Sequence, residues 1–153
     1  MLFYNFGAKN HSTKDLKREI TILLAEDDED DVFLFKHALS EIKTAVSLKV
    51  VADGSDVIDC LCGDFIPDLI FLDINMPKLN GIECLQQIKS LPALSRIPVI
   101  FLSTNSGLKI ISEVKDSGAK GYISKPNSIE MLIQVLESVL KIDWDKNEDF
   151  FLR

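Results

Sequence analysis

The chain has 153 residues, of which 46% are hydrophobic and 27% charged, which suits one globular domain with a hydrophobic core. Its net charge of −7 argues against binding to nucleic acid or to an anionic membrane surface, because both require a basic face. No apolar run approaches the roughly 20 residues of a membrane span, and Met1–Lys14 lacks the apolar core of a secretory signal. Three cysteines do not suggest a disulfide framework, so a cytoplasmic protein is expected.

Strand-like and helix-like segments alternate along most of the chain. Residues 1–18 are interpreted as a polar arm with an aromatic cluster, 19–142 as the folded domain and 143–153 as a tail. Buried strands are predicted from apolar, β-branched runs at 20–25, 46–52, 69–72, 97–102 and 121–124. Helical spacing of apolar residues predicts helices at 32–42, 57–61, 82–88, 108–114 and 129–140, the last capped by Asn127. This alternation predicts the α/β class, with a doubly wound, five-stranded parallel sheet and five helices.

Side chains with reactive or metal-binding chemistry follow four of the predicted strands. They are Glu26, Asp27, Asp73, Ser103, Thr104 and Lys125. We expect them to converge, because the carboxyl ends of parallel strands lie along one edge of a sheet. Three carboxylates in one cleft repel one another unless one is protonated or a cation lies among them, and oxygen ligands favour Mg²⁺. A carboxylate nucleophile, Mg²⁺, a lysine and a hydroxyl are the groups that phosphoryl transfer requires.

Four motifs resemble those of the receiver domains of bacterial two-component response regulators. They are ILLAEDD (22–28), LIFLDINMPKLNG (69–81), PVIFLST (98–104) and GAKGYISKP (118–126), and the resemblance covers about residues 20–141. It implies the flavodoxin-like strand order 2-1-3-4-5. The sequence after residue 141 is too short for a DNA-binding output domain. The tail, with Trp144 and Phe150–Leu152, is similar to tails of single-domain receivers associated with phytochrome-type kinases, so we expect a stand-alone receiver.

The resemblance also implies a role for each candidate site residue. Asp73 would be the phosphoacceptor. A magnesium ion would be bound by Glu26, Asp27, Asp73 and the carbonyl of Asn75. The phosphoryl group would be contacted by Ser103, Thr104 and Lys125, and the switch pair would be Ser103 and Tyr122. A cis peptide bond is expected between Lys125 and Pro126.

The implied function is signalling rather than enzymatic. A sensor histidine kinase or a histidine phosphotransfer protein would donate the phosphoryl group, and an unknown downstream protein, or a second copy in a homodimer, would bind the switched surface. One alternative is a Mg²⁺-dependent phosphatase with an aspartyl-phosphate intermediate, but such enzymes usually have a second acid where Asn75 stands. Another is a scaffold of the same fold that is not phosphorylated, for which degenerate acids would be expected. The absence of a G-x-G-x-x-G motif and of a P-loop argues against a dinucleotide or nucleotide site.

Overall fold

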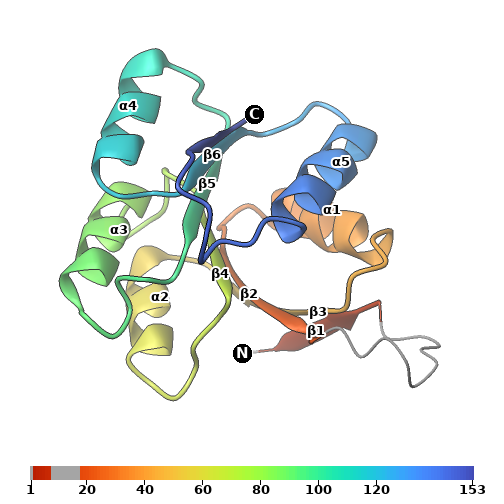
Figure 1. Ribbon diagram of the computed structural model, residues 1–153, viewed down its shortest axis with the longest axis horizontal. Helices are drawn as coiled ribbons and strands as arrows, with labels where there is room; N and C mark the ends of the chain where they lie inside the picture. Colours follow the sequence, from red (N-terminus) through yellow and green to blue (C-terminus); the bar gives the residue numbers. More distant parts are fainter. Residues whose placement is uncertain (1, 8–17) are drawn as a thin grey trace.

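A central β-sheet with helices on both faces forms the protein. The computed structural model describes residues 2–7 and 18–153. The strands are β1 (Phe3–Phe6), β2 (Ile20–Ala25), β3 (Val46–Val51), β4 (Leu69–Leu72), β5 (Val99–Ser103), β6 (Gly121–Ser124) and β7 (Phe151–Leu152). The helices are α1 (Glu29–Ser40), α2 (Gly54–Leu61), α3 (Gly81–Ser90), α4 (Leu108–Asp116) and α5 (Ile129–Leu140). Helices α2, α3 and α4 cover one face of the sheet, and α1 and α5 cover the other (Figure 1).

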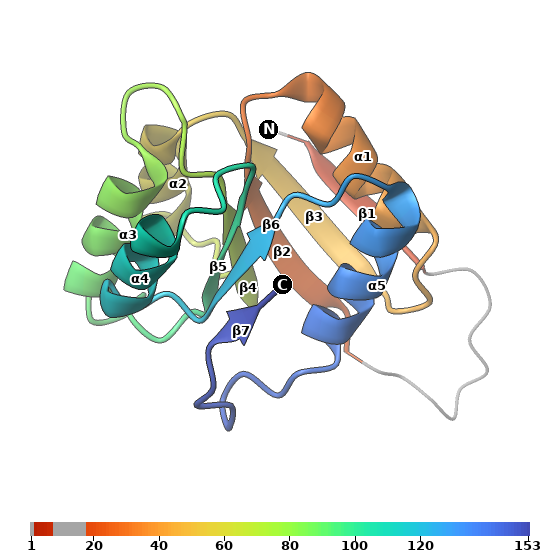
Figure 2. The same ribbon diagram turned by 90° about the horizontal axis from the view of Figure 1, so that it is seen from above.

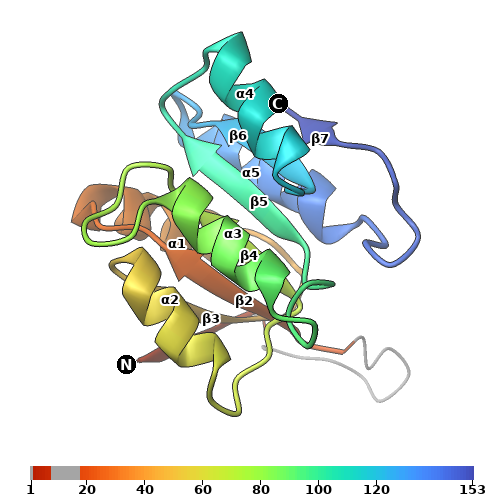
Figure 3. The same ribbon diagram turned by 90° about the vertical axis from the view of Figure 1, so that its left-hand side faces the viewer.

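The five central strands confirm the predicted fold. Their order is β3-β2-β4-β5-β6, all parallel, which is the expected 2-1-3-4-5 arrangement. Every residue of β4 and β5 is buried, as continuous apolar strands between two helical layers should be. Two hydrophobic clusters, one on each face of the sheet, anchor the helices. The arrowheads of β2 and β5 point to the same edge of the sheet (Figure 3), which is the edge that carries the site.

Both ends of the chain extend this sheet, which the sequence interpretation did not foresee. Strand β1 pairs antiparallel with β3, and Figure 2 shows it lying beside that strand. Its side chains alternate, so that Tyr4 and Phe6 are partly buried while Phe3 is exposed. The sheet therefore includes part of the segment interpreted as an arm; the rest of that segment, residues 1 and 8–17, lies outside the described residues.

At the opposite edge, the tail strand β7 pairs parallel with β6. Phe151 is buried in the same hydrophobic cluster as α5, and its amide donates to the Lys120 carbonyl at 2.9 Å. Gly121 makes this close approach possible, because a Cβ there would lie 2.9 Å from the Phe151 carbonyl oxygen. The apolar end of the tail is thus part of the folded domain.

Two local expectations near the end of β6 are wrong. The described residues contain no cis peptide bond, so Lys125–Pro126 is trans, the isomer that X–Pro bonds favour by about 0.5–1 kcal/mol. The N-cap of α5 is Ser128 and not Asn127: the helix begins at Ile129, as predicted, and the residue directly before it is the cap. The Ser128 hydroxyl accepts a hydrogen bond from the Met131 amide at 3.2 Å.

Candidate functional site

Three carboxylates meet at the carboxyl edge of the sheet. One oxygen each from Glu26, Asp27 and Asp73 lies within 4.8 Å of the other two. Glu26 and Asp73 are buried and Asp27 is exposed, so solvent reaches this acidic site from the side of Asp27. The structure therefore brings together the three acids that follow β2 and β4.

Backbone hydrogen bonds of the sheet fix where these acids stand. The Asp73 amide donates to the Ala25 carbonyl at 3.1 Å, and the Glu26 amide donates to the Val51 carbonyl at 3.0 Å. The Glu26 carboxylate in turn accepts from the Asp28 amide at 3.1 Å, which orients it within the loop that precedes α1. Because the acids continue the sheet ladder, their positions are set by the hydrophobic core beneath them.

Lys125 reaches into this acidic site from the end of β6. Its Nζ atom lies 2.7 Å from Glu26 Oε2, 2.7 Å from Asp31 Oδ2 and 3.2 Å from Asp73 Oδ2. Burial lowers the pKa of this ammonium, but the hydrogen bonds to Asp31 and Glu26 outweigh it, so the pKa is raised above its ordinary value. The side chain therefore stays positively charged among the carboxylates at neutral pH.

Asp31 is a member of the site that the sequence interpretation missed. Asp31 lies within a run of six acidic residues, 26–31, and from the sequence alone its expected role is a favourable interaction with the dipole at the start of α1. Asp28 caps α1 by accepting hydrogen bonds from the amides of Asp30 and Asp31, which places the Asp31 carboxylate over the acidic site. Nothing in the sequence itself distinguishes Asp31 from its acidic neighbours.

Two residues with hydroxyl side chains, Ser103 and Thr104, stand at the end of β5. Ser103 is fully buried, and its Oγ accepts a hydrogen bond from the Asn105 amide at 3.3 Å, whereas Thr104 is exposed. Tyr122 on β6 is also fully buried, and its hydroxyl donates to the Asn105 carbonyl. Burial raises the pKa of this phenol. The ring of the expected switch tyrosine thus points inward in this structure.

Asn75 lies on the loop that leaves β4. Its amide donates to Asp73 Oδ1 at 3.4 Å, and the residue is exposed. Its backbone therefore lies beside the acidic group, next to the Asp73 oxygen that Lys125 does not contact.

The comparisons with known proteins identify the family of the chain. The family model described as the response regulator receiver domain matches residues 22–137. That span includes every site residue named above. The chain belongs to this family.

Three relatives illustrate the match. The phosphorylated cyanobacterial phytochrome response regulator RcpA is 32% identical, with a TM-score of 0.75 over 84% of this receiver and 96% of that chain. The Mn²⁺-bound form of response regulator Rcp1 is 28% identical, with a TM-score of 0.73 over the same shares. The probable methanogenesis regulatory protein FilR2 of Methanothrix harundinacea is 25% identical over 94% of this chain and 97% of its own.

Family membership establishes the general function. Response regulator receivers act in two-component signalling, where they are phosphorylated by histidine kinases, and they are generally signalling proteins rather than enzymes. The family binds Mg²⁺ or Mn²⁺ at an acidic pocket. No helix in the described part of the chain has the length and apolar character needed to span a bilayer.

The acids of this receiver suit a hard divalent cation. Carboxylate oxygens are the ligands that Mg²⁺ prefers, and a partly open site leaves room for the waters that this ion retains. Asp27 is exposed, on the side from which a metal ion can enter. A bound ion would supply positive charge for a transferring phosphoryl group.

The raised pKa of Glu26 leads us to expect a metal affinity that depends on pH. Burial raises the pKa of its carboxyl from 4.5 to about 7, the hydrogen bond from Lys125 opposes this shift and the charge of Asp73 adds to it. Because a metal ligand must be ionised, we expect Mg²⁺ to bind roughly tenfold more tightly at about pH 8 than at about pH 6. Titration calorimetry in buffers of different ionisation enthalpy should also detect proton release at the lower pH. Equal affinity at both values would contradict this assignment.

The same shift affects the stability of the metal-free receiver. The folded state holds the Glu26 proton more tightly than the unfolded state. Protonation of Glu26 therefore contributes to the free energy of folding, and this contribution is fully present below about pH 4.5 and is lost as the pH rises through about 7. Urea unfolding of the wild type and of Glu26→Gln should therefore give a difference in stability that changes over this interval, because the variant cannot titrate there.

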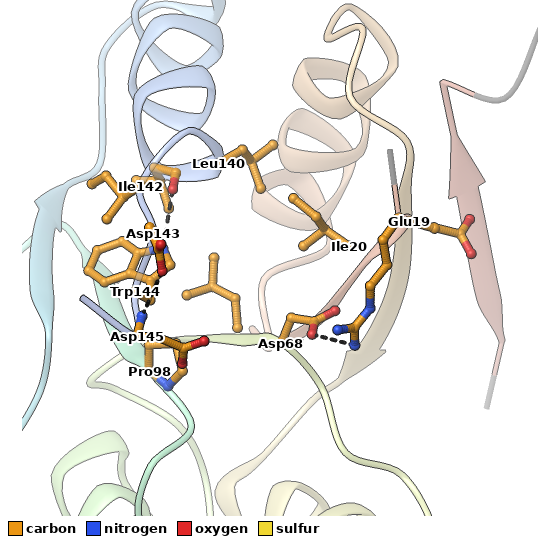
Figure 4. Close-up of a pocket in the computed structure, with 12 residues that line it drawn as sticks. Glu19, Ile20, Asp68, Pro98, Leu140, Ile142, Asp143, Trp144 and Asp145 are labelled. Atoms are coloured by element: carbon orange, nitrogen blue, oxygen red, sulfur yellow. Dashed lines mark hydrogen bonds and ion pairs between the residues drawn. The ribbon is translucent and has the colours of Figure 1, made fainter. Parts of the chain in front are cut away.

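A hollow lies at the amino ends of the strands, and its lining contains none of the site residues described above. It has a volume of about 260 Å³, and Figure 4 shows Trp144 and Ile142 on one side and Ile20 and Asp68 on the other. Ile20 begins β2, and Asp68 directly precedes β4. Because the strands are parallel, this hollow is at the amino ends of the strands, far from the acids at their carboxyl ends.

Proposed function

We propose that Asp73 is the residue of this receiver that accepts the phosphoryl group. One observation carries the proposal: the buried Asp73 carboxylate lies in one site with two further carboxylates, Glu26 and Asp27, and with the Lys125 ammonium. A carboxylate oxygen attacks the phosphorus atom of a phosphohistidine, the P–N bond breaks and a P–O bond forms. The imidazole leaves with the electron pair and takes up a proton, and no oxidant or reductant is required.

The other site residues would neutralise the negative charge of the transferring phosphoryl group. Mg²⁺ would be bound by Glu26, Asp27, Asp73 and the Asn75 carbonyl. Lys125 would face the negative charge that develops on the equatorial oxygens, and the hydroxyls of Ser103 and Thr104 would supply further donors. Preorganised charges of this kind provide most of the catalysis in phosphoryl transfer.

The switch is assigned to Ser103 and Tyr122. A phosphoryl oxygen on Asp73 would draw the Ser103 hydroxyl away from the Asn105 amide, and the buried Tyr122 ring lies beside the same loop. Movement there reaches the surface formed by α4, α5 and the strand β7 that pairs with β6, and a downstream protein would bind this surface. The donor would be a sensor histidine kinase or a histidine phosphotransfer protein. A homodimer stays a prediction.

Intact mass spectrometry tests this function directly. After incubation with Mg²⁺ and acetyl phosphate, the wild type should gain one phosphoryl group, and the gain should be lost when EDTA is added first. Asp73→Asn removes the nucleophile with little change in volume and should gain nothing. A gain in the variant equal to that of the wild type would refute the assignment.

A further inference from the structure

We propose that Asp31 is a positioning residue, which holds the Lys125 ammonium in place for phosphoryl transfer once the metal ion has engaged the other carboxylates. This inference rests on the proposed function. It starts from the three carboxylate partners of Lys125, of which Asp31 and Glu26 are the closer, both at 2.7 Å.

The three partners are not equivalent when a cation is present. Glu26 and Asp73 belong to the group of acids whose oxygens converge within 4.8 Å, whereas Asp31 does not. A divalent ion therefore competes with Lys125 for Glu26 and Asp73. Asp31 is the partner that can keep its hydrogen bond to the ammonium without giving up a metal ligand.

Lysine needs such an anchor because its side chain is long and flexible. Ordering it costs up to about 2 kcal/mol of rotamer entropy. The Lys125 backbone is already fixed, since its amide donates to the Ser103 carbonyl at 2.8 Å. Asp31 is fixed as well, because its own amide donates to the capping carboxylate of Asp28 at 3.2 Å. The salt bridge thus joins two rigid elements, α1 and β6, and sets the direction of the side chain between them.

Asp30 provides a matched control for Asp31. It occupies the same first turn of α1, carries the same charge and also donates its amide to Asp28, at 2.9 Å. Its side chain is exposed and lies outside the Lys125 cluster. Replacing either residue with alanine therefore removes the same charge from the helix terminus, but only Asp31→Ala removes the contact with Lys125.

The first measurement does not depend on phosphorylation. In protein labelled with ¹³C-lysine and saturated with Mg²⁺, the ε-methylene signal of Lys125 can be assigned by its loss in Lys125→Met. We expect this signal to be distinct in the wild type and in Asp30→Ala, and to move to the position of mobile, exposed lysines in Asp31→Ala. Asp31→Asn, which keeps the shape of the side chain, should give an intermediate signal. An Asp31→Ala signal like that of the wild type would overturn the proposal.

The second measurement is a double-mutant cycle on phosphoryl uptake from acetyl phosphate. Asp31→Ala should slow uptake about tenfold in the wild-type background, as expected when a charge-assisted hydrogen bond is lost, and should have no further effect in Lys125→Met. An equal slowing in both backgrounds would show a merely structural role. If the wild type takes up no phosphoryl group, the proposed function fails, and the lysine signal alone decides the role of Asp31.

Discussion

Replacing Lys125 with methionine should slow phosphoryl uptake about a hundredfold, the effect of removing one preorganised donor from a transition state that develops negative charge. The ammonium lies 3.2 Å from Asp73 Oδ2, where it can contact the incoming group. Methionine retains most of the aliphatic volume of the side chain, so the change removes charge rather than packing. The measurement is the rate of mass gain with acetyl phosphate at saturating Mg²⁺.

The same substitution should have the opposite effect on metal binding. Without the ammonium, Asp73 and ionised Glu26 no longer have a competing cation, and Mg²⁺ affinity measured well above the pKa of Glu26 should increase roughly tenfold. The metal-free protein should lose roughly 2 kcal/mol of stability, less than a fully buried pair would cost, because Glu26 can take up a proton. Lys43→Met is the control, since Lys43 is exposed and lies between α1 and β3 at the opposite edge of the sheet. Slower uptake together with weaker Mg²⁺ binding would contradict this account of Lys125.

Replacing Gly81 with alanine should destabilise the protein by about 2 kcal/mol or more and should weaken Mg²⁺ binding. An added Cβ would lie 2.2 Å from the Asp73 carbonyl oxygen and 2.9 Å from the Phe101 ring. The Gly81 amide also donates to the Ile74 carbonyl at 2.9 Å, so α3 begins directly against the loop that leaves β4. The backbone of Asp73 would have to move to accept the methyl group.

Gly63→Ala is the matched control for this prediction. A Cβ at Gly63 would meet its nearest neighbour, the Cys60 carbonyl oxygen, at 3.5 Å, which is an ordinary contact. Its stability should stay within about 0.5 kcal/mol of the wild type. Urea unfolding and calorimetric Mg²⁺ titration of both variants check the two effects. A Gly81→Ala protein that is as stable as Gly63→Ala would show that the loop after Asp73 is free to shift.

The sequence predicts the central sheet well because burial controls its pattern. Strand β4 is apolar at every position and β5 is buried throughout, so both read as strands covered on two faces. Their parallel order then forces Asp73, Ser103 and Lys125 to one edge. The convergence of these side chains follows from topology and did not need any knowledge of side-chain contacts.

The remaining features depend on contacts that a linear pattern does not contain. Strands β1 and β7 are short, and only the alternation of Tyr4 and Phe6, or the apolar Phe151, hints at them. The salt bridge from Asp31 to Lys125 joins residues 94 positions apart. Asp31 rather than Asp30 makes this salt bridge because of the direction in which each side chain leaves the first turn of α1. The trans geometry before Pro126 is also not specified by the motif, because an X–Pro bond can adopt either isomer and favours trans only slightly.

The most direct test of the central claim is to locate the phosphoryl group at the level of one residue. Borohydride cleaves an aspartyl phosphate and reduces the carbonyl carbon, so the modified aspartate becomes homoserine. After treatment with acetyl phosphate and Mg²⁺, peptide mass spectrometry should find homoserine at position 73, and unphosphorylated protein should contain none. Homoserine at another aspartate of the site, such as Asp27 or Asp31, would contradict the assignment of Asp73.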